Sequence, residues 1–362
     1  MKLFNEEKKA VIAMSGGVDS STAAALLLRD GYDLVGITMR LFDGENVERK
    51  GHTCCSLDDV NDARAVAGRL GFPYYVVNFT GDFKREVIDR FVSAYQSGAT
   101  PNPCIDCNRY LKWGRFFRTA EELEHPIVAT GHYARIRKDG DRYLLLRAAD
   151  PRKDQSYVLY SMTQEELSHT LFPLGELSKE TTREIAREYG LLNADKHDSQ
   201  DICFVPDHDY AGFIERYTGT PSAPGDFLST DGTVLGRHKG IIHYTLGQRK
   251  GLGIPSDSPL YVCGIDPKAG TVTLGHEDAL FSSTAFVEEV NMIVADLPDG
   301  ARVQAKVRYR QPPEWATVYH TETGLRLEFD HPQRAITPGQ AAVLYDGEYV
   351  LAGGRLVSVN RD

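Results

Sequence analysis

A glycine-rich segment near the start of the chain has the residue types that bind phosphate. It reads Ser15-Gly16-Gly17-Val18-Asp19-Ser20-Ser21 and follows the short apolar run 11–14. Its two glycines allow a tight turn that brings backbone N–H groups close to an anion, and a following helix adds the positive end of its dipole. The serine hydroxyls can donate to phosphate oxygens, and Asp19 can hold a magnesium ion beside them.

A structural alternative for this segment is an ordinary glycine turn capped by serine or aspartate. The segment is not a Walker A loop, because no Gly-Lys-Ser or Gly-Lys-Thr sequence ends it. Its place directly after a buried-strand pattern favours a pyrophosphate-binding loop over a plain turn.

Three cysteines form the second chemical group. Cys104 and Cys107 lie in the segment 100–108, whose prolines at 101 and 103 disfavour a helix and predict a rigid loop. Cys203 lies in the segment 198–204. Cys-x-x-Cys spacing serves as a metal half-site, as a redox pair, or as a nucleophile with a neighbouring thiol.

A structural zinc site would need two further ligands at a regular spacing. His52, Cys54 and Cys55 are the candidates, but their arrangement is irregular. Catalytic use of the thiols is therefore the favoured interpretation. Cys263 lies among apolar residues of a predicted strand, where inert burial is expected.

The elements that must position these groups alternate between strand and helix patterns up to residue 206. Apolar runs at 11–14, 34–39, 74–77 and 127–129 are typical of buried strands, and the stretches 23–28, 60–70 and 83–95 are typical of helices. This alternation predicts an α/β class domain with a doubly wound parallel sheet and ligands at the carboxyl ends of its strands. After residue 207 helical periodicity fades. Hairpin signals at 230–233 and 346–347, with strand-like runs at 261–265 and 302–307, predict one or two small β domains.

The net charge of −10, from 41 basic and 51 acidic side chains, argues against polyanion binding unless the basic residues cluster. They do cluster in two places. Residues 232–256 contain Arg237, Lys239, Arg249 and Lys250 with no acidic residue, and a second run contains Arg302, Lys306, Arg308 and Arg310. No apolar run has the length to span a bilayer, and the mixed-charge N-terminus is not a signal peptide. We therefore expect a cytoplasmic protein with reduced cysteines and no membrane partner.

Segments over nearly the whole chain resemble the tRNA-specific 2-thiouridylases of bacteria and mitochondria, which belong to the ATP pyrophosphatase (PP-loop) superfamily. The matching segments are 13–21, 102–108, 130–134, 153–157, 202–204, 244–249, 307–310 and 337–340, in family order. The resemblance implies a PP-loop, adenine nucleotide α-hydrolase-like domain over 1–206 that binds ATP and carries out catalysis. It also implies a small central mixed or β domain that binds tRNA over 207–278, and a C-terminal β-barrel-like domain over 279–362.

The resemblance also implies a mechanism. ATP and Mg²⁺ bind at Ala13, Met14, Ser15, Gly16, Gly17, Val18, Asp19, Ser20, Met39 and Gly131. The C2 oxygen of an extruded wobble uridine attacks the α phosphate of ATP, which releases pyrophosphate and leaves an adenylated base. Cys203 carries a persulfide loaded by a sulfur-relay protein, and its terminal sulfur reaches C2 directly or as hydrosulfide released when Cys107 attacks. The second route leaves a Cys107–Cys203 disulfide, and AMP departs from a 2-thiouridine.

One departure from the family pattern concerns Cys104, where some members have an aspartate suited to proton transfer. Asp106 is two residues away and is not expected to take that role. Instead Cys104, Cys107 and Cys203 form a set of three thiols that could hold a 4Fe-4S cluster with one open iron. Delivery of hydrosulfide by such a cluster is the second mechanism, after the persulfide relay.

The resemblance further implies tRNA contacts, with the wobble uridines of the Glu, Gln and Lys acceptors as targets. The implied contact residues are Asn102, Pro103, Cys104, His132, Lys153, Asp154, Gln155, Arg308, Tyr309 and Gln340. Taken alone, His132 could be a loop histidine that caps a backbone group. Lys153 to Gln155 could form a plain polar loop, Arg308 and Tyr309 a solvated arginine with a core tyrosine, and Gln340 an ordinary turn residue.

Two other functions account for part of the pattern. A PP-loop enzyme that activates a carboxylate or carbonyl and transfers nitrogen would explain the loop but not Cys107 and Cys203. A non-catalytic protein that binds tRNA or a cluster is disfavoured by the intact phosphate loop.

Overall fold

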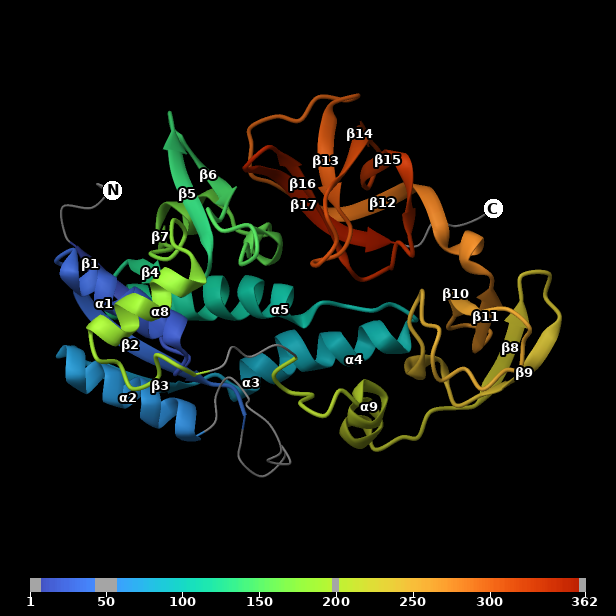
Figure 1. Ribbon diagram of the computed structural model, residues 1–362, viewed down its shortest axis with the longest axis horizontal. Helices are drawn as coiled ribbons and strands as arrows, with labels where there is room; N and C mark the ends of the chain where they lie inside the picture. The colour runs from blue at the N-terminus through green and yellow to red at the C-terminus, as the bar shows by residue number, and fades with distance from the viewer. Residues whose placement is uncertain (1–7, 43–56, 197–201, 358–362) are drawn as a thin grey trace. The chain divides into compact units, whose positions relative to one another are not determined.

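The computed structural model describes residues 8–42, 57–196 and 202–357 (Figure 1), so His52, Cys54 and Cys55 lie outside the described residues. The chain divides into two compact units. The first consists of residues 1–87, 104–208 and 348–350, and the second of residues 88–103, 209–347 and 351–362. No helix among the described residues has both the length and the apolar character needed to cross a membrane.

The first unit is built on a parallel sheet with the strand order β3-β2-β1-β4-β7. The strands are β1 (Lys9–Ala13), β2 (Asp33–Arg40), β3 (Tyr74–Asn78), β4 (Ile127–Ala129) and β7 (Thr170–Leu171). Successive residues of β1 point to opposite faces of the sheet, and Ala10, Val11 and Ile12 are all fully buried. Both faces are therefore covered, which confirms the predicted doubly wound parallel sheet.

The strand order creates the place for a site. The chain runs outward from β1 to β2 and β3 and then returns to β4 on the other side of β1. The loops that follow β1 and β4 therefore meet at a topological switch point, where ligands bind in sheets of this kind. The helices α1 (Val18–Arg29), α2 (Leu57–Leu70) and α8 (Lys179–Glu188) share one apolar core with the sheet.

The segment between β3 and β4 is almost entirely helical. It contains α3 (Thr80–Phe83), a π-helix (Lys84–Ile88), α4 (Asp89–Gln96), α5 (Pro103–Asp106), a second π-helix (Cys107–Phe116) and α6 (Phe117–Glu122). The predicted rigid loop over 100–108 is therefore wrong from residue 103 onward. Pro103 occupies the first helical position, where proline is tolerated because that N–H has no partner in the helix.

The rest of the first unit was not predicted. It contains the hairpin of β5 (Ala134–Asp139) and β6 (Arg142–Arg147), a 3₁₀ turn (Ser156–Leu159) and α7 (Gln164–Ser168). Alternation in β5 is short, because Lys138 and Asp139 end the apolar–polar pattern of residues 134–137.

The second unit contains a mixed sheet and a barrel. The mixed sheet has the order β10-β11-β8-β9 around the fully buried Phe227, Val262 and Val272. Its strands are β8 (Gly225–Ser229), β9 (Val234–His238), β10 (Tyr261–Asp266) and β11 (Thr271–Gly275). The predicted hairpin at 230–233 is confirmed by the pairing of β8 with β9. Helix α9 (Tyr210–Thr218) was not predicted, and 3₁₀ turns lie at Ile241–His243 and Glu277–Leu280.

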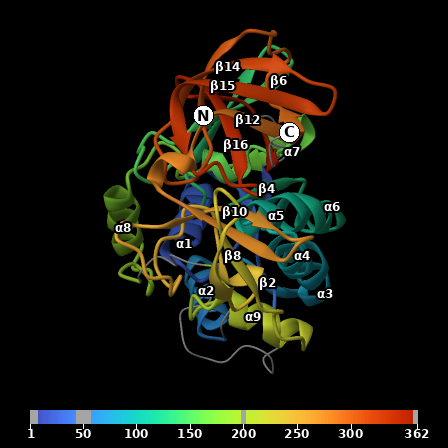
Figure 2. The same cartoon turned by 90° about the vertical axis from the view of Figure 1, so that its right-hand side faces the viewer.

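The barrel is formed by strands β12 to β17, which Figure 2 shows from a second direction. They are β12 (Phe281–Met292), β13 (Arg302–Lys306), β14 (Glu314–His320), β15 (Gly324–Arg334), β16 (Ala341–Asp346) and β17 (Tyr349–Val357). Pairing of β12 with β17 closes the sheet on itself. The predicted hairpin at 346–347 joins β16 to β17, and the predicted β-barrel class is confirmed.

Two leucines of the first unit provide a matched test of this packing. Leu34 in β2 is 1% exposed and Leu192 is 79% exposed. Leu34→Ala should lower the free energy of unfolding of the first unit by about 2–5 kcal/mol because it leaves a cavity. Leu192→Ala should change it by less than about 0.5 kcal/mol.

The measurement is a urea titration that follows the fluorescence of Trp113. The chain has two tryptophans, Trp113 in the first unit and Trp315 in the second, so a Trp315→Phe background leaves Trp113 as the reporter. Equal destabilisation by both leucine variants would contradict the described core.

Candidate active site

The phosphate loop joins β1 to α1, and its backbone requires the first of its two glycines. Gly16 has φ +71°, and a Cβ on it would lie 2.3 Å from the Asp59 carbonyl oxygen. Gly17 is the N-cap of α1, and no side chain caps the helix there. The first N–H groups of α1 therefore lack a side-chain cap, and an anion can take that place.

The serine hydroxyls of the loop are used within the loop itself. Ser20 Oγ donates to the Gly17 carbonyl (3.1 Å) and lies 3.2 Å from both the backbone N and the Oγ of Ser15. Ser21 Oγ also donates to the Gly17 carbonyl (3.0 Å) and is fully buried. Asn193 Nδ2 donates to the Gly16 carbonyl (3.0 Å) and to Ser21 Oγ (2.8 Å). The expectation that all three hydroxyls reach phosphate is therefore wrong for Ser21, which holds the loop in place.

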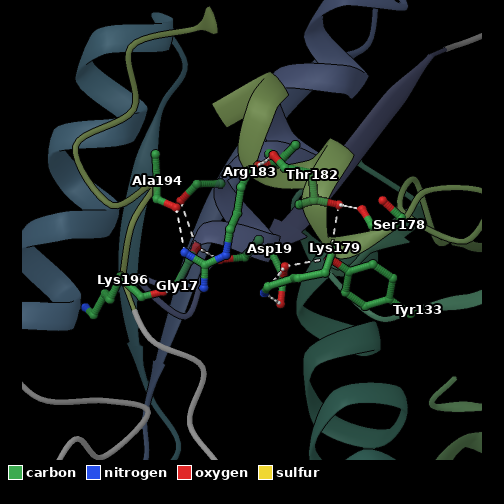
Figure 3. A network of polar contacts seen from close by, with 12 residues as sticks. Gly17, Asp19, Tyr133, Ser178, Lys179, Thr182, Arg183, Ala194 and Lys196 are labelled. Carbon is green, nitrogen blue, oxygen red and sulfur yellow. Dashed lines mark hydrogen bonds and ion pairs between the residues drawn. The ribbon is translucent and has the colours of Figure 1, made fainter. Parts of the chain in front are cut away.

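Asp19 is the centre of a polar network that the sequence did not predict. Both of its carboxylate oxygens accept hydrogen bonds from Lys179 Nζ, at 2.7 and 2.8 Å, and Oδ1 also accepts from the Tyr133 hydroxyl at 2.8 Å. The Tyr133 oxygen lies 3.0 Å from Thr182 Oγ1 of α8. Figure 3 shows Lys179 and Tyr133 converging on Asp19. The expected magnesium ligand thus already has two protein partners.

The loop after β4 packs directly against the first turn of α1. A Cβ on Gly131 would lie 2.7 Å from the Ser20 backbone nitrogen and 2.8 Å from the Asp19 carbonyl carbon. On the other side of β1, Thr38 Oγ1 donates to the Met14 carbonyl (2.7 Å) just before the half-buried Met39. Gly131 and Met39, predicted at the nucleoside, therefore lie at the ends of the strands that flank β1.

His132 lies inside the first unit. Its ring centre is 5.6 Å from that of Trp113 and 6.0 Å from that of Phe172. Burial, and to a smaller extent the Lys112 charge, lowers the pKa of His132 well below its ordinary value. Lys112 Nζ can only donate, so Nε2 accepts its hydrogen bond (3.3 Å), and protonated Nδ1 donates to Thr130 Oγ1 (2.7 Å). This neutral, enclosed ring packs against protein aromatics, in contrast to the expected stacking on an extruded base.

Cys107 is the first residue of the second π-helix, and its neighbours fix that helix. Asn108 Nδ2 donates to the Val158 carbonyl (3.0 Å), and Trp113 Nε1 donates to Thr170 Oγ1 (2.8 Å). Cys107 itself is half-buried and Cys104 is exposed. π-Helices are rare and frequently mark functional sites, which agrees with a reactive role for Cys107.

Cys203 lies in a turn closed by a hydrogen bond from the Val205 N–H to the Ile202 carbonyl (3.0 Å). The next residue, Phe204, is buried and packs edge-on against Phe83 of the same unit, with ring centres 5.7 Å apart. This packing holds the turn that carries the half-buried Cys203 thiol.

The four described cysteines form no disulfide with one another. Cys104, Cys107, Cys203 and Cys263 carry thiols, so the Cys107–Cys203 disulfide implied by the resemblance is not formed in this structure. Within residues 8–42, 57–196 and 202–357, no three His, Cys, Asp or Glu side chains are placed to share a metal ion. The possible cluster ligands Cys104, Cys107 and Cys203 are therefore not assembled into such a group. Cys263, expected to be inert, is half-buried, and its thiol donates to the Tyr261 carbonyl.

Two residues of the predicted tRNA triplet 153–155 have internal partners. Asp154 accepts from the Ala148 and Ser156 N–H groups and from Ser156 Oγ, at 3.0–3.2 Å. Gln155 Oε1 accepts from the Tyr133 N–H, and the Gln155 N–H donates to the Tyr133 carbonyl, both at 2.9 Å. These side chains position the loop that carries Tyr133, while Lys153 is partly exposed.

Among the predicted tRNA residues of the second unit, some likewise make internal hydrogen bonds and one is exposed. Arg308 donates to the Ala335 carbonyl (2.7 Å), Thr337 Oγ1 (2.8 Å) and the Leu246 carbonyl (3.4 Å). Tyr309 is 37% exposed, and Arg308 is the residue with internal partners. This is the opposite of the alternative in which the arginine is solvated and the tyrosine lies in the core. Gln340 Nε2 donates to the Thr100 carbonyl (2.6 Å). Asn102 is half-buried and Pro103 is buried.

Comparisons with family profiles cover most of the chain. Residues 8–207 match the profile described as tRNA methyl transferase HUP domain. Residues 211–276 match the tRNA methyl transferase PRC-barrel domain, and residues 282–356 match the aminomethyltransferase beta-barrel domain.

Similar proteins are found over the full length. The tRNA-specific 2-thiouridylase MnmA of Lachnoclostridium phytofermentans is 50% identical over 356 residues, which cover 97% of this chain and 99% of that protein. The tRNA-specific 2-thiouridylase MnmA of Clostridioides difficile is 48% identical over 351 residues, which cover 96% and 97%. Among solved structures, a 4-thiouridine synthetase–RNA complex with bound ATP matches at a TM-score of 0.37 and 22% identity, over 55% of this chain and 45% of that one.

Gly131 gives a prediction about the contact between the β4 loop and α1. Gly131→Ala should destabilise the first unit by about 1–3 kcal/mol, because the new methyl group forces the first turn of α1 to move. Gly81→Ala is the matched control, since a Cβ there meets nothing within 4 Å and the residue lies in helix α3. It should be neutral or stabilise by up to about 1 kcal/mol. Urea denaturation that follows Trp113 fluorescence measures both, and equal effects would contradict the packing.

His132 gives a prediction about pH. The pKa of His132 in the folded protein lies below its unfolded value, so the unfolded state binds the proton first and stability falls as pH drops below about 6.5. His132→Gln keeps an acceptor for Lys112 but removes this titration. Between about pH 7 and pH 5, the variant should lose stability less steeply than the parent, by up to about 1.4 kcal/mol per pH unit. The unfolding free energy of both proteins is measured as a function of pH. If the two curves have the same slope between about pH 7 and pH 5, His132 does not remain neutral in the folded state.

Proposed function

The chain belongs to the tRNA-specific 2-thiouridylase family, and we propose that it uses ATP to replace the C2 oxygen of the tRNA wobble uridine with sulfur. One observation carries this proposal. A phosphate loop with an open helix end and the two family thiols, Cys107 and Cys203, belong to the same compact unit. The loop supplies the activation of an oxygen, and the thiols supply the sulfur chemistry.

ATP fits the loop because its phosphates would accept from the first N–H groups of α1, for which Gly17 supplies no side-chain cap. The C2 oxygen of the uridine is a poor leaving group until adenylation converts it into part of AMP. Mg²⁺ would bind the phosphates and Asp19, and it would neutralise charge on the departing pyrophosphate. The hydrogen bonds of Ser15 and Ser20 within the loop fix its shape before ATP arrives.

Sulfur transfer follows adenylation of the C2 oxygen. The Cys107 thiolate attacks the Cys203 sulfur of a Cys203 persulfide, and the terminal sulfur leaves as hydrosulfide. The two cysteine sulfurs are oxidised to a transient disulfide while the sulfane sulfur is reduced. Hydrosulfide then attacks C2, AMP leaves, and a thiol reductant restores the reduced thiols that this structure contains. The persulfide would be supplied by a donor protein with a persulfide of its own.

Contact with tRNA is assigned to exposed cations and rings. In the second unit, Arg249 and Lys250 are exposed on a loop that Arg308 holds through the Leu246 carbonyl. The exposed ring of Tyr309 offers a stacking surface. In the first unit, Lys153 is the member of its triplet that is assigned to phosphate. The tRNAs that accept Glu, Gln and Lys are the proposed substrates.

Cysteine variants separate the two halves of the reaction. With unmodified tRNA, MgATP and a protein persulfide donor, Cys107→Ser and Cys203→Ser should lower thiolation by a factor on the order of 10³ or more, as expected for loss of a covalent group. Adenylation should persist, because the phosphate loop is intact. Thiolated tRNA is measured by its retarded migration in a mercury-containing gel, and adenylation by pyrophosphate release.

Two controls sharpen this experiment. Cys263→Ser should leave both activities unchanged, and added hydrosulfide should restore thiolation in the Cys107 and Cys203 variants, because it replaces the species that they generate. Cys104→Ser should retain thiolation in iron-free protein, because no three-ligand metal group includes Cys104 in the described residues. Binding of tRNA with no pyrophosphate release under any condition would instead identify a non-catalytic tRNA-binding protein.

A further inference from the structure

Lys179 is a buried cation beside the phosphate loop that the mechanism above does not use. It is the first residue of α8, and its side chain is only 9% exposed. Its ammonium group bonds both carboxylate oxygens of Asp19, at 2.7 and 2.8 Å, although 160 positions separate the two residues. A lysine is almost never this buried unless it is paired.

The stability of the fold does not explain this position. The N-terminal end of a helix carries partial positive charge, so a lysine at the start of α8 is unfavourable there. Asp19 is in the first turn of α1, where a carboxylate is favourable, and it also accepts the Tyr133 hydroxyl. Asp19 therefore has favourable surroundings without Lys179, in the dipole of α1 and the Tyr133 hydroxyl, and a buried ion pair is frequently no more stable than a well-packed apolar pair.

Geometry places the ammonium next to the expected phosphates. Helical side chains lean toward the N-terminus of their helix, so the Asp19 carboxylate lies beside the uncapped N–H groups of α1. An ammonium group that bonds both oxygens of this carboxylate is therefore adjacent to an anion bound at the helix end (Figure 3).

The neighbouring cations in Figure 3 have other partners. Lys196 Nζ donates to Asp59 (2.7 Å), to Asp62 (2.6 Å) and to the Gly16 carbonyl of the phosphate loop (3.3 Å), so two carboxylates and a carbonyl use its three hydrogens. Arg183 donates to the Ala194 and Lys196 carbonyls, both at 3.0 Å. Lys179 differs from both because its carboxylate partner belongs to the helix that begins at the phosphate loop.

We propose that Lys179 is a phosphate-binding residue, which leaves Asp19 for an ATP phosphate oxygen when ATP binds and Mg²⁺ takes its place on Asp19. It supplies from α8 the cation that a Walker A loop carries within the loop itself. In the absence of ATP, Asp19 holds the ammonium group near the phosphate position. This inference rests on the proposed use of ATP.

The test measures binding rather than turnover. Affinities for ATP in EDTA, for MgATP and for adenosine are determined by calorimetry for the parent, Lys179→Met, Asp19→Asn and the double variant. Lys138→Met is the control, because Lys138 is an exposed lysine of the same unit. Thermal melting checks folding, and the double variant guards against misfolding because it leaves no unpaired buried charge.

Lys179→Met should weaken binding of magnesium-free ATP by about 10- to 100-fold, the effect of losing a hydrogen bond to a charged group. Adenosine binding should not change. Asp19→Asn should bind magnesium-free ATP at least as tightly as the parent, because it frees Lys179. The double variant should bind it about 10- to 100-fold more weakly than Asp19→Asn, and Lys138→Met should match the parent.

Two results would overturn the inference. If the double variant binds magnesium-free ATP as tightly as Asp19→Asn, Lys179 only neutralises Asp19. If the parent binds magnesium-free ATP no more tightly than adenosine, the ammonium group does not reach a phosphate. Failure of the parent to bind MgATP is a separate result, which would contradict the proposed function itself.

Discussion

The first turn of α1 must stay open to an anion and yet be held rigidly, and the rest of the site depends on that constraint. A side-chain cap would stabilise the helix but would occupy the N–H groups that phosphate needs, and none is present at Gly17. Rigidity comes from contacts behind the turn. Ser20 and Ser21 bond the Gly17 carbonyl, and Gly131 packs against the backbone of Ser20 so closely that no Cβ fits. These contacts fix the backbone without covering its donors.

The same loop links the phosphate site to the surroundings of Cys107. Successive residues after β4 face different partners: Gly131 contacts α1, His132 accepts from Lys112 of the π-helix, and Tyr133 bonds Asp19. Gln155 then fixes the backbone of Tyr133 with two hydrogen bonds. A displacement of this loop would therefore disturb the ATP side and the thiol side together. That coupling suits a reaction in which hydrosulfide must appear where the adenylated base is held, because water would otherwise compete for C2.

The sequence predicted the features that local patterns encode. The parallel sheet, the phosphate loop and the hairpins at 230–233 and 346–347 follow from short runs with regular periodicity. Lys179 could not be found this way, because its partner Asp19 is distant in sequence and only the packing of α8 on α1 brings them together. The short motifs also could not show toward which part of the molecule each side chain points. His132, Asp154 and Gln340 were expected to face tRNA, yet the side chain of each makes at least one hydrogen bond inside its own unit.

The same internal hydrogen bonds hold a loop with two exposed cations on a chain whose net charge is −10. Polyanion binding depends on where cations lie and not on their sum. Arg308 uses its guanidinium on carbonyl groups, one of which belongs to Leu246, and Gln248 bonds the Thr245 N–H and the Lys250 carbonyl. The loop 245–250 is thereby held in a shape that leaves Arg249 and Lys250 exposed. Arg308 therefore fixes the positions of two cations, and groups held in place lose less conformational entropy when they bind a ligand.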